Sequence, residues 1–133
     1  MRSRSGCRRG LLLLGLLVAG GWSLGCRSQV IPLPNGHRLA RMHDETTAIL
    51  YRDEEVTIPA NVDGYRVEGD VVIGHVSTHG LDEDEVRISN PGYFILDTTN
   101  RETRQGLQKE EWNTLMSARG IKTAPDLAAP AFH

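Results

Sequence analysis

Hydrophobic and polar positions change their spacing several times along this chain, and each spacing predicts a different element. Between His37 and about Leu107, short apolar runs alternate with polar turn residues, a pattern typical of β-strands. We expect five to seven short strands, drawn from residues 39–42, 48–51, 55–58, 65–68, 71–76, 86–88, 93–96 and 103–106.

The turns between these runs predict hairpins. Arg52-Asp53-Glu54 separates two apolar runs, and Gly69 supplies the positive backbone dihedral of a tight turn. Val71–Val76 is apolar at successive positions, which favours an interior strand, and Tyr93–Leu96 is the most apolar segment and the expected central strand. The residues from Ser77 to Asp84 are predicted to form an acidic loop.

A helical spacing appears near the end of the chain. Trp112, Leu115 and Met116 fall on one face of a helix predicted from Gln108 to Arg119. Gly120 follows as the expected glycine cap. A helix of about three turns is too short to be stable alone in water, so this Trp112 face is expected to pack on the sheet.

The pattern therefore predicts an α+β fold: a small antiparallel β-meander with one C-terminal helix. The folded domain is expected at residues 37–122. Two prolines make residues 26–36 a tether, and residues 123–133, rich in proline and alanine, are expected to be a disordered tail.

The start of the chain has a different composition. Arg2, Arg4, Arg8 and Arg9 precede an uncharged apolar run of 16 residues from Leu11 to Cys26. A bilayer span needs about 20 residues, so this run is short for one. A positive start, a short apolar stretch and small residues at its end predict a secretory signal peptide over residues 1–25.

The end of that run, Ser23-Leu24-Gly25-Cys26, resembles the lipobox of bacterial lipoproteins. The usual pattern has Leu where this chain has Ser23. The resemblance implies cleavage between Gly25 and Cys26 and a diacylglycerol, with fatty acids such as palmitate, on the Cys26 thiol. It also implies attachment to a membrane of the cell envelope. By resemblance to the sorting rule of double-membrane bacteria, Arg27 after the cysteine favours the outer membrane, facing the periplasm.

Two other interpretations of the leader stay open. Ser23 and Gly25 also suit an ordinary signal peptidase, which would leave Cys26 free, and an uncleaved leader would act as a short anchor. The pair Arg8-Arg9 resembles a twin-arginine export signal, so the export route stays open too.

Composition narrows the function classes. Aromatic residues make up 5% of the chain, and its net charge is -2. All 17 acidic residues follow Cys26, whereas 4 of the 15 basic residues precede it, so the mature part carries 11 minus 17, or -6. An acidic, aromatic-poor protein is not expected to bind nucleic acid. The two cysteines, Cys7 and Cys26, both lie in the leader region, so no disulfide framework is expected in the domain.

One short segment carries candidate chemistry. His75 and His79 lie four residues apart, and Asp82 follows, so these residue types suit a zinc site or a small hydrolase together with Ser77. A strand running into a loop would separate the three side chains, and we therefore expect neither metal nor other cofactor, and no catalytic residues.

The segments GYFILDTTNRETRQGLQKEEW and YRVEGDVVIGHV loosely resemble uncharacterised small bacterial lipoproteins, a likeness that implies no activity. The sequence therefore favours a lipid-anchored envelope protein whose domain binds an envelope protein or small ligand. The alternatives are an enzyme that uses His75, His79 and Asp82, and a structural envelope protein.

Overall fold

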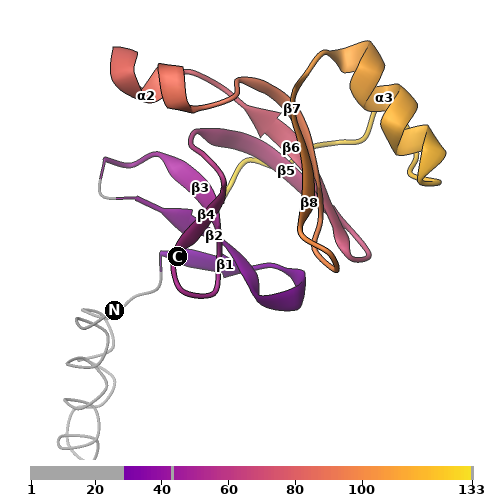
Figure 1. Cartoon of the computed structure of the whole chain (residues 1–133), viewed down its shortest axis with the longest axis horizontal. Helices are drawn as coiled ribbons and strands as arrows, with labels where there is room; N and C mark the ends of the chain where they lie inside the picture. Colours follow the sequence, from indigo (N-terminus) through magenta and orange to yellow (C-terminus); the bar gives the residue numbers. More distant parts are fainter. Residues whose placement is uncertain (1–28, 43, 133) are drawn as a thin grey trace, which may run out of the picture. The chain divides into compact units, whose positions relative to one another are not determined.

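Two antiparallel sheets make up most of the computed structural model, which describes residues 29–42 and 44–132 (Figure 1). The first sheet holds, in order, β1 (Val30–Pro32), β2 (His37–Arg41), β3 (Thr47–Tyr51) and β4 (Glu55–Ile58). The second holds β5 (Val62–Glu68), β6 (Val71–Val76), β7 (Gly92–Asp97) and β8 (Glu102–Leu107). The helices are α2 (Glu83–Ile88) and α3 (Lys109–Ala118), and a short 3-10 turn spans Pro34–Gly36. The α+β class is confirmed, but the described residues form eight strands in two four-stranded meanders rather than five to seven in one.

The two sheets share an apolar core between their inner faces. Alternate residues of each strand point into it, as the two-residue period of a strand requires. Both sheets contribute fully buried side chains to this cluster: Leu39, Ile49, Ile58, Val62, Val72, Val76, Phe94 and Leu96. Gly74 on β6 leaves no room for a side chain, because a Cβ there would stand 2.3 Å from the Gly64 carbonyl oxygen and 2.7 Å from the Phe94 ring.

The outer face of the second sheet is covered by α3. Trp112 and Met116 pack against Ile73 and Ile95, which lie on the opposite face of their strands from the inter-sheet core. Gly120 (φ +76°) follows the helix as the predicted glycine cap: the Ile121 amide donates to the Met116 carbonyl, and the Gly120 amide donates to the Ser117 carbonyl. This pair of bonds satisfies carbonyls that the end of the helix would otherwise leave free.

Three parts of the chain differ from the sequence-based expectation. Residues 86–88, predicted as an edge strand, belong to α2, because Asp82 and Glu85 form a capping box: the Glu85 amide donates to the Asp82 carboxylate at 2.9 Å, and the Asp82 amide to Glu85 Oε1 at 3.2 Å. The predicted acidic loop therefore ends at this cap. The tether is ordered from Val30, because Val30–Pro32 pairs with β2 as an edge strand.

The third difference is the C-terminal tail, which the sequence predicts to be disordered. The Tyr65 amide donates to the Ala128 carbonyl at 3.0 Å, and the Ala128 amide donates back to Tyr65 at 2.9 Å. Leu127 packs against the same cluster as α3 and lies over Gly64. The tail thus extends the second sheet along the edge strand β5, which supplies backbone partners that composition does not reveal.

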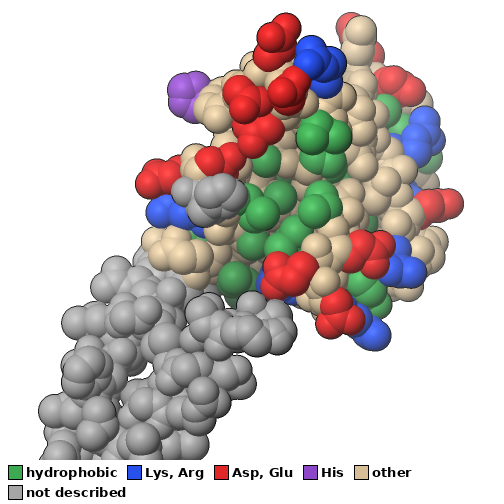
Figure 2. Space-filling model, turned by 60° about the vertical axis from the view of Figure 1, so that its left-hand side comes forward, with side chains coloured by type: hydrophobic (Ala, Val, Ile, Leu, Met, Phe, Trp, Pro, Cys, Tyr) green, Lys and Arg blue, Asp and Glu red, His purple; other side chains and the backbone are tan. Residues whose placement is uncertain are grey.

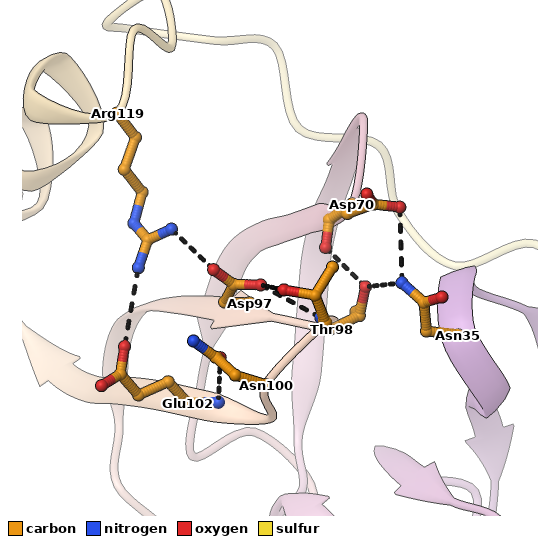
Figure 3. Close-up of polar contacts among 8 residues, drawn as sticks. Asn35, Asp70, Asp97, Thr98, Asn100, Glu102 and Arg119 are labelled. Carbon is orange, nitrogen blue, oxygen red and sulfur yellow. Dashed lines mark hydrogen bonds and ion pairs between the residues drawn. The ribbon is translucent and has the colours of Figure 1, made fainter.

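A polar network joins the turns at one end of the domain (Figure 3). Asn35, in the 3-10 turn, donates to Thr98 at 2.9 Å and to Asp70 at 3.3 Å, and the Thr98 hydroxyl donates to the Asp70 carbonyl. Asp97 accepts from Thr99 at 2.6 Å and from Arg119 at 3.0 Å. The Thr99 hydrogen bond, helped by Arg119, lowers the pKa of Asp97. The network therefore links the first sheet, both hairpin turns of the second and the end of α3.

Candidate functional site

His75 lies on β6, on the outer face of the second sheet, beside α3. Its Nδ1 is 2.9 Å from Asp63 Oδ1, and both side chains are partly exposed. Its ring meets the edge of Tyr93 at 4.7 Å, and Tyr93 stacks on Trp112 at 4.2 Å. Asp63 was not among the residues that the sequence predicted to act with His75. In the β5–β6 hairpin, which turns at Gly69, Gly64 lies opposite His75, and Asp63 is the residue before it.

His79 and Asp82 have other partners. The His79 amide donates to Ser77 Oγ at 3.3 Å, and the His79 carbonyl accepts from Asn61. The Asp82 carboxylate caps α2. The structure therefore does not bring His75, His79 and Asp82 together, and within residues 29–42 and 44–132 no group of three His, Cys, Asp or Glu side chains is arranged to hold a metal ion.

The Trp112 side chain is part of the core rather than of a surface. It is 2% exposed, and its Nε1–H donates to the Phe94 carbonyl at 3.0 Å. Met116 is fully buried and Leu115 partly buried against the same cluster. The leader, with the predicted cleavage and lipidation sites at Gly25 and Cys26, lies outside the described residues.

The outer face of the first sheet carries an apolar groove. Ala40, Ala48 and Leu50 are buried on this face, with Met42 and Ala60 packed against them. The groove has a volume of about 510 Å³ and runs between the sheet and α2. Figure 2 shows hydrophobic side chains gathered on this face, with acidic side chains on either side of them. The residues that line it are Met42, Asp44, Thr46, Ala48, Val56, Pro59, Ala60, Leu81, Glu85, Ile88 and Ser89.

Exposed apolar side chains mark the rim of this groove. Ile88 is 71% exposed and Val56 is 54% exposed, and both line the groove. The described residues contain one more exposed large hydrophobic side chain, Val67, which does not line it. Ile88 is held at the rim by α2, whose last turn is closed by hydrogen bonds from the Ser89 amide to the Glu85 carbonyl and from its hydroxyl to Val86.

Two carboxyl groups, those of Asp44 and Glu85, also line the groove. Asp44 Oδ1 accepts from the Thr46 hydroxyl at 2.6 Å and from the Thr46 amide at 3.1 Å. These bonds lower the pKa of Asp44, and the neighbouring Glu85 side chain contributes in the same direction. At the other end of this face Arg38 pairs with Glu54 at 2.8 Å. The groove thus has an apolar floor and an ionised carboxylate at its rim.

Sequence reasoning missed this surface although two signals were present. Thr47–Tyr51 is apolar at consecutive positions, which is typical of a strand covered on both faces. The Asp-x-x-Glu spacing at residues 82–85 is a capping-box signature that predicts α2. The pairing of that helix with one particular sheet face is not readable from either signal.

Comparisons with known proteins give no relatives: no protein-family model, curated protein or solved structure matches the chain. Among the described residues no helix is both long enough and apolar enough to cross a bilayer.

Proposed function

We propose that this chain is a lipid-anchored protein of a bacterial cell envelope, and that its domain binds a partner through the groove on the first sheet. The observation that carries the binding function is the exposed apolar rim, where Ile88 is 71% and Val56 is 54% exposed. Contiguous exposed apolar surface framed by polar residues is typical of interaction sites.

The arrangement of the two sheets supports this assignment. Each sheet has one face in the shared core and a second apolar face. On the second sheet that outer face is buried under Trp112 and Met116 of α3. On the first sheet, α2 borders the groove from one side, and Val56 stays exposed on β4. A bound partner would remove this apolar surface from water, which is favourable in proportion to its area.

Membrane attachment is a proposal from the leader alone. It rests on the arginine-rich start, the short apolar run and Ser23-Leu24-Gly25-Cys26. Acyl chains on Cys26 would hold the domain at the membrane, and two or more chains give a durable anchor. Arg27 favours the outer membrane, with the domain in the periplasm. The enzyme alternative receives no support from geometry, because His75, His79 and Asp82 each have separate partners.

The anchor is tested by metabolic labelling with a fatty-acid analogue in cells that express the chain. The wild type should be labelled and fractionate with membranes, whereas Cys26→Ala should lose the label and remain soluble or unprocessed. Normal labelling of Cys26→Ala would refute the lipoprotein assignment.

Binding is tested by placing a photo-crosslinking amino acid at position 88, on the groove rim, and at position 110, on the exposed side of α3, in otherwise wild-type chains. We expect a discrete crosslinked product from position 88 in envelope fractions and none from position 110. Equal products from both positions, or none from position 88, would contradict the groove as a binding site.

A further inference from the structure

The charge around the groove identifies the chemistry of its occupant. The first turn of α2 carries Glu83, Asp84 and Glu85, and its last turn carries Arg87. Arg87 pairs with Asp84 and, at 3.8 Å, with Glu83. Glu85 faces the groove instead, together with Asp44, and within residues 29–42 and 44–132 neither carboxylate has an Arg or Lys partner.

Asp44 and Glu85 differ in this respect from two neighbouring acidic residues, Glu54 and Glu55, which have basic partners. Glu54 pairs with Arg38 at 2.8 Å, and Glu55 pairs with Arg101 at 3.4 Å. The hydrogen bonds from Thr46 keep Asp44 in its charged form. The groove therefore offers an apolar floor beside negative charge that lacks an internal counter-ion in the described part of the chain.

From this complementarity we propose that the groove binds a basic amphipathic segment of another protein, with its apolar residues on the groove floor and a Lys or Arg beside Asp44 and Glu85. The inference rests on the proposed binding function and specifies its partner. An apolar stripe flanked by cations is the complement of this surface, as in other complexes in which an amphipathic helix lies in a hydrophobic groove.

Charge also disfavours the two simplest other occupants. A second copy docked through the same face would bring the carboxylates of both rims together, and like charges in contact oppose association. The part of the chain after Cys26 carries a net charge of -6, because it holds 11 basic and 17 acidic residues. An anionic lipid surface would be repelled by the same rim.

The test measures binding of fluorescent synthetic peptides to the chain from residue 27 to 133. That fragment contains all of Val30–Phe132, which forms one compact unit, so it retains every contact described above. One probe is an amphipathic Leu/Lys helix of about four turns. A second has the same Leu pattern with Glu in place of Lys, and a third has the Leu/Lys composition in scrambled order. Fluorescence anisotropy at low and at physiological salt reports affinity.

We expect the Leu/Lys helix to bind more tightly than either control peptide, and more weakly as salt screens the rim charges. The double variant Asp44→Asn, Glu85→Gln should lose about five- to tenfold in affinity for it. Both substitutions keep an oxygen acceptor for the Thr46 and Asp82 amides, so the fold is retained. The matched control Glu110→Gln, Glu111→Gln removes the same charge from α3 and should bind like the wild type.

The apolar contribution has its own pair of variants. Ile88→Ser at the rim should weaken binding of the Leu/Lys helix about tenfold. Val67→Ser, at an exposed valine outside the groove, should leave it unchanged. Circular dichroism of all four variants checks that each remains folded.

Several outcomes would overturn the proposal. A basic amphipathic partner in the groove would be refuted if the scrambled peptide bound as tightly as the Leu/Lys helix, or if the Leu/Glu helix bound more tightly. It would also be refuted if the Glu110→Gln, Glu111→Gln control lost as much affinity as the Asp44→Asn, Glu85→Gln variant. Self-association in light scattering that Ile88→Ser abolishes would identify a second copy as the occupant. If no peptide binds but position 88 still crosslinks in cells, the binding function stands and the assigned partner chemistry is wrong.

Discussion

Replacing Trp112 by alanine should remove most of the stability of this domain. The indole is 2% exposed, lies among Ile73, Ile95 and Met116, and stacks on Tyr93 at 4.2 Å. Truncation of a buried Trp to Ala costs about 3–5 kcal/mol, because transfer energy is lost and a cavity remains. Total stability of a domain is about 5–15 kcal/mol, so this loss is a large fraction of it.

A second substitution separates the hydrogen bond from the packing. Trp112→Phe keeps an aromatic ring against Tyr93 but removes the Nε1–H that donates to the Phe94 carbonyl at 3.0 Å. Loss of that donor costs about 1–3 kcal/mol. The expected order of stability is therefore wild type, then Trp112→Phe, then Trp112→Ala, with Val67→Ala as a control at an exposed position.

Thermal and urea unfolding of the fragment from residue 27, followed by circular dichroism, measure this order. Each kcal/mol shifts the midpoint by about 4–8 °C in a domain of this size. Trp112→Ala should therefore melt at least about 12 °C below the wild type or be unfolded at room temperature, whereas Val67→Ala should change the free energy of unfolding by less than about 0.5 kcal/mol. A Trp112→Ala midpoint equal to that of the wild type would refute the packing of α3 described here.

Three further predictions concern other parts of the fold. Gly74→Ala should prevent stable folding, because its Cβ would stand 2.3 Å from the Gly64 carbonyl oxygen, whereas Gly64→Ala, with 3.2 Å to its nearest neighbour, should cost far less in a thermal melt. Deletion of residues 123–133 should lower stability by about 1–3 kcal/mol in urea unfolding, since it removes the two hydrogen bonds with Tyr65; an unchanged midpoint would contradict the ordered tail. The pKa of Asp97 is lowered in the folded state, so its contribution to the free energy of unfolding is complete above the ordinary pKa of 3.8 and is lost as pH falls through the lower folded pKa. The difference in free energy of unfolding between wild type and Asp97→Asn, measured by urea unfolding at a series of pH values, should therefore narrow over that acidic range.

The sequence by itself determined the local elements whose signals lie within a few residues. The turn at Gly69 and the helix on Trp112 and Met116 formed where spacing predicted them, and Gly120 ends that helix. Such elements depend on the spacing of apolar residues, on helix and strand propensity and on helix capping, and each of these involves residues close together in the sequence. The α+β class followed from the same signals.

The prediction of an edge strand at residues 86–88 was wrong, because two local signals compete there. Val86 and Ile88 alternate with Arg87 as in a strand, but the capping box between Asp82 and Glu85 favours a helix. Ile88 then lies exposed at the groove rim instead of pairing in a sheet.

Only the tertiary structure decided which faces meet. Strand register decides that Ala48 and Leu50 face outward. Contacts between distant segments decide that His75 pairs with Asp63 and that Ala128 pairs with Tyr65. The same holds for the groove, because Asp44 and Glu85 are 41 positions apart and meet through the packing of α2 beside the first sheet. Free energy from burying apolar surface is non-directional and depends on the whole chain, so it selects these pairings only when both sheets are assembled.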